Sequence, residues 1–400
     1  MLATLRAHAL SHPLLLVAIV VALFALLGLA RNRFRLIRHR RSPSAPGSGS
    51  DLAGLPSTSL IVLLYVAVVI VYTATPAYLD HVEPSVASVS WMVVSGQPAY
   101  PDREGAGLYG LPYGPMLFLL NGLTMRVLGA SIITSKLAGA GAALASLSLV
   151  GLALWRVRGE WLRAMRWTVL VYLMFGAAST WVRAEPLLLL TSGLAVLSLT
   201  VPRVPSLLLL GLAIGMGVNL KVSAIIYLFP ALVLVARTHG WGASAAAAGV
   251  AAVAAAVPYL AFPNVSFAGY LSWLQAAAGQ GVRLGALPTA LEWMIVLTIP
   301  MFAIGRSNIG RGDADAGVFR VLVIASMAVS IPLAVKHGTG VYHFLPFVPS
   351  IMFAACADRQ PGRLTLAPAM LATFALIAAL QVTAWVAAMT SLPARQIVSD

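Results

Sequence analysis

Apolar runs separated by short polar segments follow one another along nearly the whole 400-residue chain. A straight helix needs about 20 mainly apolar residues to cross a bilayer. The runs predict twelve spanning helices, near residues 11–30, 58–79, 132–155, 166–182, 186–201, 206–221, 222–236, 241–262, 287–305, 319–335, 342–357 and 364–388. Those at 186–201, 206–221 and 222–236 are short, so they are expected to tilt, merge or end before the far interface. The pattern predicts an all-α, polytopic transmembrane protein.

Composition and charge agree with this fold class. Sixty per cent of the residues are hydrophobic and ten per cent are charged, which excludes a water-soluble globule, since its surface needs far more polar cover. The net charge of +14 comes mostly from arginines clustered between apolar runs, as in cytoplasmic loops, and does not indicate a nucleic-acid partner. The single cysteine, Cys356, lies in an apolar run, where an inert buried thiol is expected.

The beginning of the chain differs from the rest. The run 11–30 has the length of a signal peptide, but it lacks a clear cationic segment before it, and six arginines follow it. The next stretch, SPSAPGSGSDLAGLPS, is typical of a flexible linker. We therefore predict that residues 1–57 form an accessory transmembrane helix with a basic cytoplasmic linker. Residues 58–400 then form the main transmembrane domain, with an outer loop at 80–131.

The positions of the arginines decide the role of the apolar run 112–129. If this run does not span, 17 Lys and Arg residues face the cytoplasm and 9 face the other side; if it spans, the division is 13 to 13. Cationic loops remain cytoplasmic, so 112–129 is predicted to be a re-entrant or interfacial helix on the outer face, with both chain termini outside. Alanine and arginine usage favours a bacterial protein, whose outer face is periplasmic.

Polar residues that are costly inside a membrane gather in the predicted outer loops. The first of these loops begins with Asp80, His81 and Glu83. Pro84 favours the start of a short interfacial helix that ends at Gly96. Glu83 can cap this helix or take part in chemistry, whereas Asp80 lies too early to cap it and is favoured as a functional carboxylate.

Three tyrosines, Tyr100, Tyr109 and Tyr113, lie in the Gly/Pro-rich remainder of this loop. Their rings can stack on a sugar and their hydroxyls can bond its oxygens, but interfacial tyrosines also anchor loops without binding a ligand. Both roles remain open. The charged run 102–104 is expected to be a solvated cluster.

Two lysines, Lys221 and Lys336, interrupt apolar stretches and need an anion there. An acidic side chain or a phosphate headgroup can supply it. Gly211 and Gly215 precede Lys221 on one helix face and predict close packing beside it.

Two further outer segments carry polar side chains. Arg183 and Glu185 can form a local ion pair at the start of a helix or contribute to a site. His337, Tyr342 and His343 add hydrogen-bonding groups near Lys336. Two histidines six residues apart are a weak metal signal, so no metal site is predicted. The sequence requires no cofactor, and a divalent cation stays open.

In their order and common outer-side placement, these segments resemble the GT-C class of integral-membrane glycosyltransferases. The resemblance is to the glycosyltransferase family 39 type, with the protein O-mannosyltransferases and the aminoarabinose transferase acting on lipid A. It is carried by Asp80 after the first core helix, GQPAY, YGPMLFLLNGLTMRVLGASIITSKLAG, WVRAEPLLLL, GLAIGMGVNLK and GTGVYHFLPFVP. The adjacent acidic pair of the family corresponds here to Asp80 and Glu83, which leaves open which of them is the base.

The resemblance implies a polyprenyl monophosphate sugar as donor and a glycan, lipid or protein as acceptor. It implies that Asp80 is the general base of an inverting transfer, since a carboxylate in a partly dry cavity has raised basicity. The candidates for the donor phosphate are Lys221, Lys336 and Arg183. The candidates for other substrate contacts are His81, Tyr100, Tyr109, Tyr113, Glu185, His337, Tyr342 and His343.

A lipid-linked-sugar flippase or another transporter would also place charges in a membrane cavity. A transporter needs such sites on both faces, whereas the unusual residues here gather on one, which favours the transferase. A non-catalytic assembly subunit is the third hypothesis, and it predicts that replacement of Asp80 is harmless. The sugar, the lipid chain, the acceptor and the oligomeric state stay open.

Overall fold

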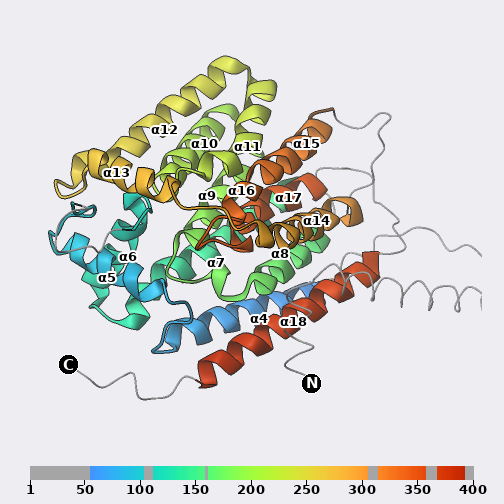
Figure 1. The fold of residues 1–400 in the computed structure, drawn as a ribbon. Helices are drawn as coiled ribbons and strands as arrows, with labels where there is room; N and C mark the ends of the chain where they lie inside the picture. Colours follow the sequence, from blue (N-terminus) through green and yellow to red (C-terminus); the bar gives the residue numbers. More distant parts are fainter. Residues whose placement is uncertain (1–54, 103–110, 158–160, 305–313, 357–366, 392–400) are drawn as a thin grey trace, which may run out of the picture.

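The computed structural model describes residues 55–102, 111–157, 161–304, 314–356 and 367–391 as a bundle of helices (Figure 1). The accessory helix predicted at 11–30 and the linker after it lie outside the described residues.

Regular structure in the described residues is helical, apart from a β-bridge between Val282 and Lys336. The α-helices are α4 (Leu55–Ala74), α5 (Glu83–Val94), α6 (Pro115–Leu128), α7 (Ile132–Val157), α8 (Trp161–Phe175), α9 (Ala184–Ser198), α10 (Arg203–Val218), α11 (Ala224–His239), α12 (Trp241–Ala261), α13 (Phe267–Ala278), α14 (Leu287–Ile304), α15 (Ala314–Val329), α16 (Ile331–Ala334), α17 (Val348–Cys356) and α18 (Ala367–Ser391). The 3-10 helices are η1 (Gly176–Ser179), η2 (Leu284–Ala286) and η3 (Val341–Phe347).

Five of the twelve predicted spans coincide with long apolar segments of the described residues. Five segments in the described chain are long and apolar enough to cross a membrane: α7, α12, η2 with α14, α15 with α16, and α18. Six shorter apolar helices accompany them, among them α4 and the consecutive α9, α10 and α11. The all-α, polytopic architecture expected from hydropathy is therefore confirmed.

Some boundaries differ from the expected ones. The helix expected at 166–182 ends at Phe175, because Gly176 takes a positive φ of 55° and begins the 3-10 turn η1. The sequence interpretation missed α13, which is too short to be found as a span. Its start is fixed by Ser266, whose Oγ accepts a hydrogen bond from Gly269 N at 3.1 Å.

Small residues let the central helices approach closely. A Cβ on Gly211 or Gly215 of α10 would lie 2.5 Å from the Cβ of Val250 or Ala254 on α12, so the predicted close packing is confirmed. On α7, a Cβ on Gly139 would lie 2.5 Å from the Trp181 carbonyl oxygen. This contact places the turn before α9 directly against α7.

Helices α5, α6 and α13 gather at one end of the bundle, where α4 also ends, at the left of Figure 1. The run 112–129 forms the 14-residue α6, which packs along α5; a Cβ on Gly122 would lie 2.3 Å from the Ser90 carbonyl oxygen. Helices α5 and α6 are 12 and 14 residues long, shorter than the roughly 20 residues of a straight span. That they lie at the outer face stays a prediction.

The loop between α5 and α6 is tied to the α12–α13 connection. Ala99 N donates to the Asn264 carbonyl at 3.0 Å, and Asn264 Nδ2 donates to the carbonyls of Val93 at 2.8 Å and Gln97 at 2.6 Å. Tyr100 packs on Tyr270 of α13, with ring centroids 5.3 Å apart. The described part of the loop is therefore held against a helix from far along the chain.

Candidate active site

The chain turns sharply between α4 and α5, and this turn presents Asp80. Asp80 Oδ1 accepts from Val82 N at 2.9 Å, while Glu83 Oε1 accepts from Asp80 N at 2.9 Å. The bond from Val82 N to the Asp80 carboxylate, two residues back, is that of an Asx-turn. The N-cap position of α5 is Val82, and no side chain caps the helix there, which confirms that Asp80 lies too early to cap it.

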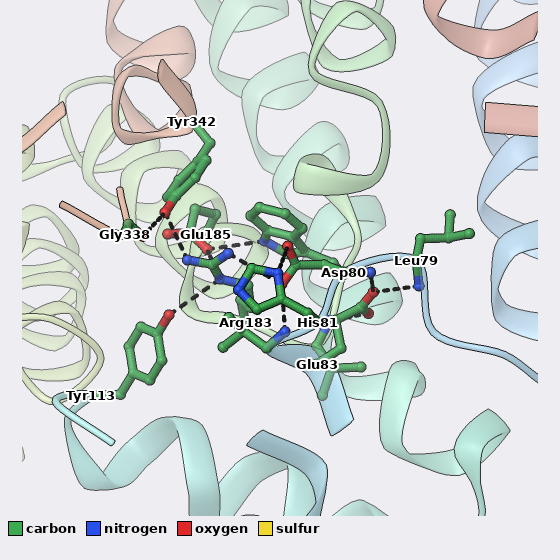
Figure 2. A network of polar contacts seen from close by, with 12 residues as sticks. Leu79, Asp80, His81, Glu83, Tyr113, Arg183, Glu185, Gly338 and Tyr342 are labelled. Carbon is green, nitrogen blue, oxygen red and sulfur yellow. Dashed lines mark hydrogen bonds and ion pairs between the residues drawn. The ribbon is translucent and has the colours of Figure 1, made fainter. Parts of the chain in front are cut away.

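Glu83 is fully buried, and its carboxylate binds donors of the protein itself. Oε1 also accepts from Leu79 N at 3.0 Å. Oε2 accepts from Val182 N at 3.0 Å and from the Tyr72 hydroxyl. Four donors therefore converge on this one side chain, and two of them lie in the Asp80 turn (Figure 2).

Arg183 lies at the centre of the cluster drawn in Figure 2. Its Nη1 is 3.4 Å from Asp80 Oδ1, its Nε donates to the Tyr113 hydroxyl at 3.2 Å, and its Nη2 donates to the Tyr342 hydroxyl at 2.8 Å. The guanidinium also lies 4.4 Å from the centroid of the Trp181 ring and 4.6 Å from that of Tyr342. Such stacking favours a desolvated arginine.

Glu185 and Lys221 form the deeper part of the cluster. The buried Glu185 carboxylate accepts from Trp181 Nε1 at 3.0 Å and from Lys221 Nζ, and it lies 3.9 Å from Arg183 Nε. Burial lowers the pKa of the Lys221 ammonium, and the Glu185 carboxylate opposes that shift. Lys221 therefore has the acidic partner that was one of its two expected alternatives, and Glu185 lies between two cations.

A glycine contact explains why Tyr113 and Lys221 meet. A Cβ on Gly114 would lie 2.1 Å from the Asn219 carbonyl oxygen. Gly114 N donates to the Leu220 carbonyl at 3.0 Å, so the start of α6 docks on the turn between α10 and α11. Lys221 Nζ lies 5.3 Å from the centroid of the Tyr113 ring, and burial raises the pKa of the Tyr113 hydroxyl.

Asp80 is the acidic member of the cluster that reaches the surface. Its side chain is 20% exposed, against 1% for Glu185. Oδ1 is held by Val82 N and Arg183, while Oδ2 faces the exposed imidazole of His81, with Nδ1 at 3.6 Å. One oxygen of Asp80 is thus fixed by backbone and arginine donors, and the other lies beside the exposed His81 ring.

The other candidates lie apart from this cluster or beside it. Lys336 Nζ donates to the Ala277 carbonyl at the end of α13, and His337 is exposed. His343 is buried next to Tyr342, with Nδ1 3.4 Å from the Tyr227 hydroxyl, and its Nε2 has no hydrogen-bond partner among the residues that the structure describes.

Tyr100 is also buried, and its hydroxyl donates to the Tyr113 carbonyl at 2.8 Å, so it supports the loop that carries Tyr113. Tyr109 lies outside the described residues. Asp102 is exposed, as expected of a solvated charge. Within the described ranges, no group of three or more His, Cys, Asp or Glu side chains is arranged to hold a metal ion.

Sequence reasoning missed Tyr72, Trp181 and Lys136 as members of this region. Lys136 carried a usable signal, because a lysine inside an apolar helix needs partners. Tyr72 and Trp181 carried none, since aromatic side chains are common in membrane helices and at their ends.

The helical fold is of the GT-C type that the resemblance predicted, and the chain is an integral membrane protein. The solved structure with which it was matched is ArnT from Cupriavidus metallidurans bound to undecaprenyl phosphate. The match has a TM-score of 0.57 and 13% sequence identity, and it covers 84% of this chain and 76% of ArnT. At this identity the likeness is one of fold. No family model and no curated protein sequence matches the chain.

Proposed function

We propose that the protein is a membrane glycosyltransferase that moves a sugar from a polyprenyl-phosphate donor to an acceptor hydroxyl on the periplasmic face of a bacterial inner membrane. The observation that carries the proposal is the convergence of Asp80, Arg183, Tyr113 and Tyr342, which come from four distant segments (Figure 2). ArnT, which has a similar fold, was solved with undecaprenyl phosphate bound. That structure supports a lipid-linked donor.

Asp80 is assigned as the general base. Its Oδ2 accepts the proton of the acceptor hydroxyl while the hydroxyl oxygen forms a bond to the anomeric carbon of the sugar. The bond between that carbon and the phosphate oxygen breaks with inversion, and its electron pair leaves with the polyprenyl phosphate. Asp80 suits this role better than Glu83, because Glu83 is buried and its oxygens already accept four hydrogen bonds.

Arg183 and Lys221 are assigned to the donor phosphate, whose negative charge increases when the sugar leaves. Both cations are held before the substrate arrives, by Glu185 and the surrounding rings, so little reorganisation is needed during the reaction. The hydroxyls of Tyr113 and Tyr342 both contact Arg183 and can bond phosphate or sugar oxygens beside it. Lys336 is given a smaller part, because its ammonium is engaged with the end of α13.

The test is a comparison of cell envelopes. A deletion strain is complemented with the wild-type gene, with Asp80→Asn, or with Asp102→Asn, which changes an exposed carboxylate of the same outer loop. Glycolipids and envelope glycans are compared by mass spectrometry at matched membrane levels of each protein. We expect the deletion to remove one glycosylated product, and Asp102→Asn to restore it. Asp80→Asn should form the product more slowly than wild type by a factor of about 10²–10⁴, the usual contribution of a general base to the rate.

Two outcomes would reject the proposal. Full restoration of the product by Asp80→Asn would favour an assembly subunit with this fold. Accumulation of an unflipped lipid-linked sugar in the deletion strain, with transfer intact in opened membranes, would favour a transporter.

A further inference from the structure

Lys136 is a charged residue inside α7 that the proposed chemistry does not use. Its side chain is fully buried, and Nζ donates to three carbonyl oxygens, those of Tyr72 at 3.0 Å, Thr75 at 2.8 Å and Ala77 at 2.6 Å. The ammonium also lies 4.3 Å from the centroid of the Tyr72 ring. An ammonium has three protons to donate, and each has an acceptor here.

The three carbonyls belong to the end of α4 and to the turn that follows it. The last carbonyls of a helix have no partner within the helix, so a buried helix end must find donors elsewhere. Lys136 supplies them from α7. It thereby fixes the direction in which the chain leaves α4, a few residues before Asp80.

Tyr72 connects this lysine to Glu83. Its carbonyl accepts from Lys136, and its hydroxyl donates to Glu83 Oε2. The Tyr72 ring is buried and stacks on Trp385 of α18, with centroids 5.5 Å apart. Lys136 and Trp385 therefore fix the position of Tyr72, and the Tyr72 hydroxyl in turn fixes the position of the Glu83 carboxylate.

Glu83 binds the backbone of the two segments that carry Asp80 and Arg183. Its Oε1 binds the backbone N–H of Asp80, and its Oε2 binds the backbone N–H of Val182, the residue before Arg183. The two segments that carry Asp80 and Arg183 are thus joined through one carboxylate.

We infer that Lys136, Tyr72 and Glu83, the anchor triad, are positioning residues that set the geometry between Asp80 and Arg183. The inference rests on the function proposed above, and it assigns Glu83 a role other than that of the base. A displacement of about 1 Å between reacting groups can cost on the order of 10² in rate. Loss of one member of the anchor triad should therefore slow the reaction by roughly 10- to 100-fold, without removing the base.

The first experiment separates positioning from proton transfer at Glu83. Membranes are prepared from the deletion strain carrying wild type, Glu83→Gln or Asp80→Asn. The rate at which they form the product that the deletion strain lacks is measured as a function of pH. We expect Glu83→Gln to lower the rate by roughly 10- to 100-fold while keeping the fall in rate on acidification that reports protonation of the base. Among the described residues, the charged or titratable groups that face Asp80 are Arg183, His81 and Tyr342, and all three are unchanged in this variant.

The result that overturns the role of Glu83 is a loss as complete as that of Asp80→Asn, or a residual rate that no longer falls on acidification. If Asp80→Asn itself retains the wild-type rate, the proposed function fails and not this inference alone. The two failures are therefore distinguishable.

The second experiment tests Lys136 with Lys136→Met and Lys136→Arg. Arg126→Met on the exposed part of α6 serves as control. Maximal product rate is measured together with the affinity of the purified proteins, in lipid nanodiscs, for undecaprenyl phosphate. We expect Lys136→Met to lower the maximal rate by roughly 10- to 100-fold while the affinity changes less than threefold, and Lys136→Arg to recover part of the rate. An unchanged rate in folded Lys136→Met overturns the inference, and so does an equal loss of rate and lipid affinity.

If Lys136→Met does not fold, Tyr72→Phe decides. It removes the hydroxyl bonded to Glu83 and keeps the ring that packs on Trp385. A lowered maximal rate with unchanged lipid affinity supports the anchor triad, and a wild-type rate overturns it.

Discussion

Gly114 is the residue through which the start of α6 docks on the turn between α10 and α11. Its φ of −70° and ψ of 159° suit any L-residue, so alanine at this position meets no backbone strain. The obstacle is steric, because the added Cβ would lie 2.1 Å from the Asn219 carbonyl oxygen and 2.3 Å from its carbon. The opposing atoms are backbone and cannot rotate away, so Gly114→Ala must separate the two segments.

The cost follows from what this separation breaks. Overpacking of a close contact costs about 1–3 kcal/mol. Two hydrogen bonds join the segments, from Gly114 N to Leu220 O and from Met116 N to Asn219 O, and each is 3.0 Å long. Each contributes about 1 kcal/mol net to stability. We expect Gly114→Ala to lower the free energy of unfolding by about 3–5 kcal/mol. It should also move Tyr113 away from Arg183 and Lys221.

The assay compares thermal unfolding of the purified proteins in detergent with titrations of undecaprenyl phosphate. Gly141→Ala in α7 is the control, because a Cβ there meets no atom of the described residues within 4 Å. Alanine in a helix interior should stabilise that variant by up to about 1 kcal/mol. We expect a melting temperature several degrees lower and weaker lipid binding for Gly114→Ala alone. Wild-type stability and affinity in that variant would refute the contact between α6 and the α10–α11 turn.

Two further predictions concern buried polar pairs. Lys221→Met and Glu185→Gln should each weaken undecaprenyl phosphate binding, and the double variant should lose less than the sum by roughly 1–3 kcal/mol, because both changes remove the same buried ion pair. Additive losses in titrations of the three variants would contradict the pair. Asn264→Ala should lower the free energy of unfolding by roughly 1–3 kcal/mol, because the carbonyls of Val93 and Gln97 lose a donor. Equal resistance to limited proteolysis would show that this amide does not fix the loop between α5 and α6.

The sequence was sufficient for the long apolar helices, because such helices are determined by local hydropathy. The charge count also separated α6 from the long spans, since it uses an asymmetry distributed over all loops. Helix α13 was missed because its 12 residues resemble a short apolar loop, and only its packing against Tyr100 and the Asn264 contacts make it a defined element.

The candidate site was predicted in part. Arg183, Glu185 and Lys221 were found because charges beside apolar runs are costly and need partners. Which partners they have depends on long-range contacts, such as that of Gly114 with Asn219, that no local pattern encodes. The difference in burial between Asp80 and Glu83 could likewise not be seen in the sequence. It depends on a long-range contact, in which Val182 N donates to the Glu83 carboxylate and not to that of Asp80.

The charges of the cluster explain how proton transfer and departure of the phosphate can be coupled in the proposed reaction. Arg183 and Lys221 balance Asp80 and Glu185 when all four are ionised. The contact between Arg183 and Asp80, at 3.4 Å, is longer than the 2.7–2.9 Å of a strong charge-assisted hydrogen bond. When Asp80 takes the acceptor proton, it loses its charge and its hold on Arg183, while the leaving phosphate gains negative charge. Arg183 can then interact with the phosphate in place of Asp80, so the total charge around it stays constant through the step. Glu185, bonded to Trp181 and Lys221, keeps its charge and prevents the two cations from repelling each other.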